Sequence, residues 1–325
     1  MNRRKLLVIA GLVGLLALVM LVGETLPAFR LRLASEILIF GLFALSLDVL
    51  LGYTGLPSLG HALYFGSAAY AAAVVARDHT DSFFAGLATG VVVAALVAAV
   101  AGLIALRTAG VFFLMITLAF GQLGVAVALR MSSVTGGADG LAGVLKPELP
   151  FAGVDLYEPR HFFYFTAVVV GMFVALAWWL VRSPFGAALK GVRENPGRMS
   201  ALGYNVWAHR YIAFVVSAAL SGAAGVLLSY HHGFVNPEVM GLTTSAEAML
   251  MVILGGGGTL FGPLLGAAGV LIFEDVSRGF ADRWRLLLGV TYVVTVLVAR
   301  KGLLRAVPAA WRWLARLRRS EWKEA

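Results

Sequence analysis

The chain has 325 residues, of which 60% are hydrophobic and only 13% are charged, and its mean hydropathy is +0.87. This composition excludes an ordinary soluble domain. The absence of cysteine excludes disulfides, thiol catalysis and cysteine metal sites. The sequence therefore predicts an all-α, polytopic integral membrane protein in which residues 1–325 form a single transmembrane domain.

Apolar segments in chain order predict about ten transmembrane helices, because about 20 apolar residues are needed to cross a hydrocarbon core of roughly 30 Å. The predicted spans are 5–23, 33–51, 58–76, 83–106, 111–129, 162–181, 209–230, 244–254, 260–276 and 284–299, with the eighth short. The first apolar run, residues 6–22, follows Arg3, Arg4 and Lys5. Its length and the lack of a small-x-small cleavage site before Glu24 favour a retained helix over a cleaved signal peptide.

Basic residues are distributed unevenly between the segments that connect these spans. With the N-terminus inside, the inside segments hold 17 of the 26 Lys and Arg residues, and most acidic residues lie outside. The positive-inside rule then places both termini, the 184–206 loop and the basic 301–325 tail in the cytoplasm. The net charge of +9 is explained by this orientation, so no nucleic-acid partner is expected. The tail fits either an interfacial helix on membrane lipid or a simple positive anchor.

Two glycine-rich segments interrupt the predicted helices. Residues 51–61 follow the second span, and residues 254–263, which contain four consecutive glycines, follow the eighth. Irregular backbone at membrane depth needs protein or a water-filled cavity around it, because lipid cannot satisfy free N–H and C=O groups. Such breaks flank the substrate route in transporters, but glycines also simply let helices cross closely. Both interpretations remain open from the sequence.

No catalytic or metal-binding motif accompanies these glycines. A phosphate-binding loop needs a Gly-Lys-Ser or Gly-Lys-Thr sequence, and the chain contains neither. The six histidines show no metal-ligand spacing such as H-E-x-x-H. We therefore expect no enzymatic activity, no metal and no cofactor in this chain.

Polar side chains within the predicted spans are candidates for a translocation path, because a charge in the membrane is costly and usually faces an aqueous cavity. Asp48 and Glu247 each precede a glycine break, whereas Glu36 and Glu274 also fit an interfacial position. A zwitterionic substrate would place its ammonium near a carboxylate and its carboxylate near hydroxyls or helix N-termini. The predicted path residues are Asp48, Thr54, Ser58, His61, Thr117, Glu247, Gly255 and Gly258.

The 184–206 segment is a charged, helix-like interruption of an otherwise apolar chain. Pro184 suits a first helical turn, and Phe185, Leu189 and Val192 form an apolar stripe at helical spacing. Charged residues surround this stripe, which predicts a surface that meets a cytoplasmic partner. A lipid-facing amphipathic linker is the alternative.

Several motifs occur in an order that resembles a known family. They are Gly52-Tyr53-Thr54-Gly55 with Ser58-Leu59-Gly60-His61, Gly66, Ala69-Tyr70, 117–122, 135–140, 183–186, 193–195, 201–203, and 255–256 with Gly258-Thr259. Together they resemble the LivM-like permease subunits of branched-chain amino acid ABC importers, from about residue 46 to residue 273. The E-A-A opening that is typical of the cytoplasmic loop is absent here, although Ala187-Ala188 and Gly191 occupy a comparable place.

The resemblance implies a multi-pass permease in a bacterial or archaeal cytoplasmic membrane. It implies pairing with a homologous permease subunit and two ATP-binding cassette ATPases, which would hold ATP and magnesium, and delivery of substrate by an extracytoplasmic binding protein. The 184–206 segment becomes the coupling loop, whose ATPase-contacting residues are expected to be Phe185, Lys190, Arg193, Glu194 and Asn195.

The resemblance constrains the substrate less than the family. Branched-chain or other apolar amino acids are expected, and related permeases for urea or short-chain amides are the alternative. An ion-coupled secondary carrier that uses Asp48 and Glu247 as coupling sites is the alternative of another class.

Overall fold

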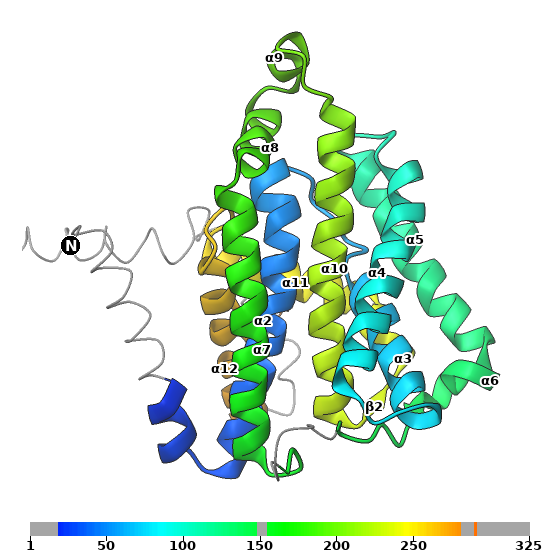
Figure 1. Ribbon diagram of the computed structural model, residues 1–325, viewed down its shortest axis with the longest axis vertical. Helices are drawn as coiled ribbons and strands as arrows, with labels where there is room; N and C mark the ends of the chain where they lie inside the picture. Colours follow the sequence, from blue (N-terminus) through cyan, green and yellow to red (C-terminus); the bar gives the residue numbers. More distant parts are fainter. Residues whose placement is uncertain (1–18, 148–154, 281–288, 291–325) are drawn as a thin grey trace, which may run out of the picture.

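The computed structural model describes residues 19–147, 155–280 and 289–290 (Figure 1). The predicted spans 5–23 and 284–299 lie largely outside the described residues, and the 301–325 tail lies wholly outside them. The elements in chain order are α2 (Ala28–Thr54), α3 (Ala62–Asp78), α4 (Phe83–Ala105), α5 (Val111–Arg130), α6 (Ser132–Thr135), η1 (Gly137–Asp139), β1 (Leu141–Ala142), α7 (Pro159–Arg182), α8 (Pro184–Glu194), α9 (Pro196–Ala201), α10 (Val206–His232), β2 (Phe234–Val235), η2 (Pro237–Met240), α11 (Leu242–Gly255) and α12 (Gly262–Phe280).

The described residues confirm an all-α, polytopic membrane protein. Five helices, α2, α4, α5, α7 and α10, are long and apolar enough to cross a membrane. Helix α11 has only 14 residues, so the predicted shortness of the eighth span is confirmed. The third span was predicted to begin at residue 58, but α3 begins at Ala62 because the backbone after Thr54 leaves the helix for seven residues.

Helices α2 and α10 form the centre of the bundle. In each, 78% of the most apolar 18-residue window is buried, compared with 28% in α4 and α7 and 22% in α5. Helix α2 contacts α7, α10, α11 and α12, whereas α10 also packs against α3 and α4. The remaining apolar surface of α4, α5 and α7 faces outward, as expected of helices that meet lipid or another subunit.

Small residues allow α3, α4 and α10 to approach closely. Gly222 lies against Ala68 and Ala94, and a Cβ atom added at Gly225 would lie 2.0 Å from the carbonyl oxygen of Phe65. Helices in lipid associate through such close packing, since their apolar side chains gain little from leaving the lipid tails.

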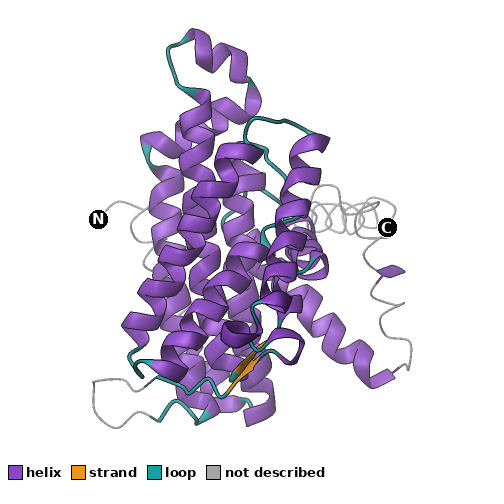
Figure 2. Cartoon of the chain, turned by 90° about the vertical axis from the view of Figure 1, so that its right-hand side faces the viewer, coloured by secondary structure: helices purple, strands orange, loops and turns teal. Residues whose placement is uncertain are grey.

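The two ends of the bundle differ. Helices α8 and α9 extend from one end, called here the α8 end (Figure 1). The opposite end carries a two-stranded antiparallel sheet in which Leu141 pairs with Val235 and Ala142 with Phe234, and it is called here the sheet end (Figure 2). This small sheet was not predicted, because two-residue strands leave no periodic pattern in a sequence.

Replacing Gly225 by Ala tests the close approach of α10 to α3. The added methyl group meets backbone that has no room to move, so we expect the free energy of unfolding to fall by about 1–3 kcal/mol. The measurement is thermal unfolding of the purified protein in detergent. Gly171→Ala on α7 is the matched control, because nothing lies within 4 Å of its added Cβ; equal melting temperatures for the two variants would contradict the packing described.

Candidate functional site

Helix α8 is fixed to the bundle by its cap and its apolar stripe. The Ser183 hydroxyl accepts a hydrogen bond from the Gly186 N–H at 3.3 Å, and Pro184 occupies the first helical position. Leu189 and Val192 are buried, and the helix contacts α2, α7 and α10. Two members of the predicted stripe therefore hold α8 against its own bundle.

The rest of the α8–α9 element is exposed. Lys190, Glu194 and Asn195 are exposed, and α9 contains no buried residue. The Asn195 side chain caps α9 by accepting a hydrogen bond from the Arg198 N–H at 2.9 Å. Phe185 is half-buried, with its ring stacked on His209 at a centroid distance of 5.7 Å. This element offers a polar, projecting surface at the α8 end (Figure 1).

Both glycine breaks meet α8 at one place, called here the junction and made by Asp48, Gly52, Arg193 and Gly258. The Arg193 guanidinium donates a hydrogen bond to the carbonyl oxygen of Gly52, near the end of α2. The Gly258 N–H, in the turn between α11 and α12, donates to Asp48 Oδ1 at 2.7 Å. A cavity of about 420 Å³ lies beside these contacts. The junction connects three segments that are far apart in the sequence.

Glycine is required at the centre of the junction. A Cβ atom at Gly52 would lie 2.1 Å from Asp48 Oδ1 and 2.4 Å from the Gly258 nitrogen. Gly258 itself has φ of +78°, a conformation that residues with a side chain rarely adopt. Gly52 therefore allows a close approach, as the packing interpretation of the glycines predicts, and Gly258 forms an irregular turn. That the breaks flank a substrate route stays a prediction.

Protein groups satisfy the backbone of the first break, as expected for irregular chain at membrane depth. The Leu59 N–H donates to the Thr117 hydroxyl at 3.2 Å, and the Ala62 N–H donates to the Ser245 hydroxyl at 3.0 Å. Helices α5 and α11 therefore hold the segment between α2 and α3.

His61 lies in the core of the bundle. It is fully buried, its Nε2 is 2.9 Å from the Ser46 hydroxyl, and its ring stacks on Phe43 at a centroid distance of 5.7 Å. The Ser217 hydroxyl donates to the Ser46 carbonyl oxygen at 2.5 Å, which extends these contacts to α10. The histidine thus connects the first break to α2 and α10.

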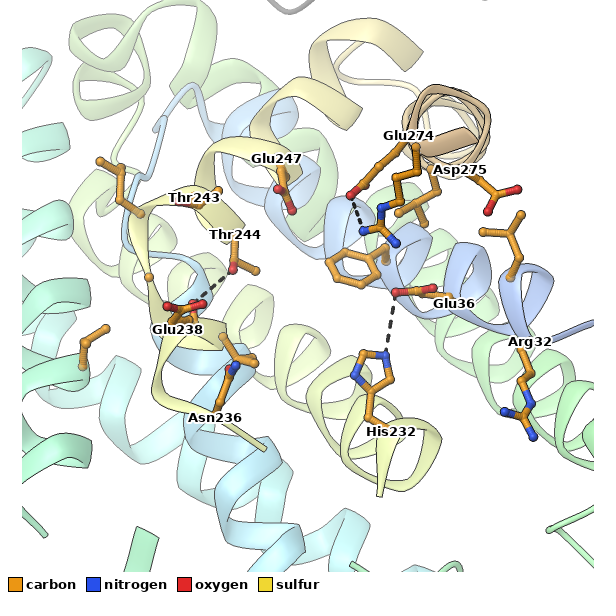
Figure 3. A pocket seen from close by; sticks show the side chains of 18 of the residues that line it. Arg32, Glu36, His232, Asn236, Glu238, Thr243, Thr244, Glu247, Glu274 and Asp275 are labelled. Carbon is orange, nitrogen blue, oxygen red and sulfur yellow. Dashed lines mark hydrogen bonds and ion pairs between the residues drawn. The ribbon is translucent and has the colours of Figure 1, made fainter. Parts of the chain in front are cut away.

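A cavity of about 1240 Å³ opens at the sheet end between α2, α5, α11 and α12 (Figure 3). Glu36, Glu247 and Glu274 line a common space, in which Arg278 pairs with Glu274 at 2.6 Å and His232 lies 3.7 Å from Glu36. Five carboxylates and two arginines line this cavity among the described residues. The lining therefore carries both signs of charge with an excess of negative charge.

The predicted path residues separate into two groups. Glu247 lines the large cavity and Gly258 the small one. The others line neither of these two cavities and belong to the junction or to the packing around the breaks: Asp48, Thr54, Ser58, His61, Thr117 and Gly255.

The structure brings together one group that the sequence did not indicate. Ligand atoms of Glu36, His231 and His232 all lie within 4.8 Å of one another. No spacing signals this group, because Glu36 is on α2 and the histidines end α10. Lys146 and Arg32 are close by, and burial together with the Arg32 charge lowers the pKa of the Lys146 ammonium. These two cations disfavour a divalent metal, so the group is better described as part of the charged cavity mouth.

Long apolar helices, irregular breaks inside the bundle and a projecting polar helix define the class as a polytopic membrane permease. The chain belongs to the family described as branched-chain amino acid transport system / permease component, which matches residues 29–299. Members of this family are non-catalytic subunits of ABC transport systems.

Individual relatives agree with this family. The chain is 29% identical to the high-affinity branched-chain amino acid transport system permease protein LivM of Salmonella typhimurium, over 84% of this chain and 69% of the relative. It is 28% identical to LivM of Escherichia coli over the same shares. The permease LivH of Escherichia coli is 31% identical over 33% of this chain and 34% of the relative. No solved structure matches the chain significantly.

Single cysteines in this naturally cysteine-free chain test the two kinds of path residue. We expect Glu247→Cys to react with a soluble maleimide at least about tenfold faster than Ser58→Cys, because thiol reactivity depends on access. Ser58 is 0% exposed, and Glu247 lines the open cavity. The measurement is the labelling rate of the folded protein in detergent, with the unfolded protein as the reference. Equal rates would contradict the cavity.

Proposed function

We propose that this chain is a transmembrane permease subunit of an ATP-binding cassette importer for branched-chain or other apolar amino acids. The observation that carries the proposal is the junction, where the exposed α8–α9 element joins both glycine breaks through Arg193 and Asp48. A partner that moved α8 would act directly on two irregular segments of the membrane domain. Family membership supports the same mechanism and favours it over an ion-coupled secondary carrier.

The proposed orientation places the α8 end in the cytoplasm, with N-in and C-in termini and about ten transmembrane helices. The charges around α8 support it, because Arg182, Lys190, Arg198 and Arg210 all lie at this end. The membrane is then a bacterial or archaeal cytoplasmic membrane, in which α4, α5 and α7 present apolar side chains to lipid or to a neighbouring subunit.

Two ATPase subunits, which would bind ATP and magnesium, are the proposed partners at this end. Lys190, Glu194 and Asn195 are exposed and suit the ATPase contact, and Phe185 contributes its half-buried ring at the base of α8. The Arg193 guanidinium is engaged with Gly52, so its proposed role moves from the ATPase contact to the junction.

The sheet end is the proposed docking side for an extracytoplasmic binding protein. It presents α6, η1 and residues 155–158, which lead into α7, and the large cavity opens there. A second, homologous permease subunit is the proposed neighbour in the membrane, which would complete the path. Similarity to both LivM and LivH supports a pair of related permeases.

The lining of the large cavity supports an amino acid substrate over urea or a short-chain amide. A zwitterion carries separate positive and negative groups, which can be placed near Glu247 and near Arg32 or Arg278. A neutral amide gains little from charged groups of both signs. Apolar residues Phe40, Leu118 and Val125 in the same lining suit an aliphatic side chain.

Single cysteines on opposite ends test the orientation. We expect a membrane-impermeant maleimide to label Thr80→Cys in intact cells and Ser200→Cys only after the membrane is opened, because both positions are exposed at opposite ends of the bundle. Gel-shift labelling of the expressed protein is the measurement. Labelling of Ser200→Cys from outside would reverse the proposed orientation.

Charge reversal on α8 tests the ATPase contact. We expect Lys190→Glu combined with Glu194→Lys to lower ATP-driven uptake in liposomes at least about tenfold, because like charges placed across an interface cost several kcal/mol. The assay uses the assembled permease pair, ATPases and binding protein, with labelled leucine and with urea. Arg107→Glu, at the same end but outside α8–α9, is the control. Uptake that needs an ion gradient and no ATP would contradict the importer.

A further inference from the structure

The junction contains the buried carboxylate of Asp48. In the proposed importer, movement of α8 would have to be transmitted to the membrane helices at this place. Asp48 is 0% exposed, and its Oδ2 has no hydrogen-bond partner among the described residues. Burying a carboxylate is costly unless its charge is compensated. Here Oδ1 is held by the Gly258 N–H at 2.7 Å, and the Arg193 guanidinium is close to Gly258.

The contacts of the junction lead from α8 to the walls of the large cavity. Gly258 lies in the turn between α11 and α12, and these two helices pack against each other and against α2. Helix α11 carries Glu247 and α12 carries Glu274 into the lining of the cavity at the sheet end. The turn therefore connects two of the cavity walls directly.

The two hydrogen bonds of the junction connect different pairs of segments. Arg193 holds α8 to the end of α2 through the Gly52 carbonyl oxygen, and Asp48 holds α2 to the α11–α12 turn through the Gly258 N–H. A Cβ atom added at Gly258 would lie 3.2 Å from the Gly52 oxygen and 3.3 Å from Arg193 Nη1, so the two hydrogen bonds lie close together. Helix α8 therefore reaches the second hydrogen bond through α2, which carries both Gly52 and Asp48.

We propose that Asp48 and Arg193 are positioning residues that transmit the movement of α8 to the α11–α12 turn and so couple ATP hydrolysis to opening and closing of the large cavity. This inference rests on the proposed importer function. Neither residue touches substrate or ATP in this role. Asp48 and Arg193 affect how much substrate is transported for each ATP that is hydrolysed.

Three variants test this role in the reconstituted importer with its partner permease, ATPases and binding protein. We expect Asp48→Ala and Arg193→Leu to lower leucine uptake per ATP hydrolysed at least about threefold, as expected for residues that carry coupling between distant sites. Asp48→Asn keeps an oxygen acceptor for the Gly258 N–H and is expected to retain most of the wild-type ratio. Leu47→Ala, a buried neighbour on α2 outside the junction, is expected to lower the melting temperature but not the ratio.

The ratio separates transmission from stability, because a structural defect lowers uptake and hydrolysis together. An unchanged ratio in both Asp48→Ala and Arg193→Leu overturns the inference, as does an equal fall in Leu47→Ala. If Asp48→Ala does not assemble, Arg193→Leu compared with Leu47→Ala decides. A wild-type complex without ATP-driven uptake overturns the proposed function itself, and the inference with it.

Discussion

The structure depends on one constraint, which is that backbone leaving a helix inside the membrane must find its hydrogen bonds within the protein. Two segments among the described residues break this way, and helices from elsewhere in the chain supply acceptors to both. Thr117 accepts from the Leu59 N–H of the first break, Ser245 accepts from the Ala62 N–H that follows it, and Asp48 accepts from the Gly258 N–H of the second. These hydrogen bonds constrain how α5, α11 and α2 are arranged. Each of these helices must place an acceptor oxygen at the depth of a particular backbone N–H group.

The sequence indicated the class of fold, the breaks and the α8–α9 element, because each of them has a local signature. Apolar length predicts spans, glycine runs predict irregular backbone, and Ser183-Pro184 predicts the start of a helix. The start of α3 was placed too early because residues 58–61 are compatible with helix when read alone. Only the contacts of Leu59 with α5 and of His61 with α2 show why the segment stays outside a regular helix.

The connections between these elements could not be predicted. Arg193 and Gly52 are 141 residues apart, and Asp48 and Gly258 are 210 apart. An exposed arginine beside an apolar stripe has the same local pattern whether it faces a partner or its own bundle. Glu36 and His232 likewise meet only because the ends of α2 and α10 coincide at the mouth of the cavity. Such long-range pairs depend on the packing of whole helices, which no short motif records.

The two ends of the bundle are held by different kinds of interaction, and this difference suits alternating access. At the sheet end, charged groups surround an open cavity, so the walls there are separated by a space that a substrate can enter. At the α8 end, hydrogen bonds of Arg193 and Asp48 connect three segments around glycines, beside the apolar contacts of Leu189 and Val192. Individual hydrogen bonds contribute only about 0.5–1.5 kcal/mol net to stability, so a few of them can be exchanged during a transport cycle.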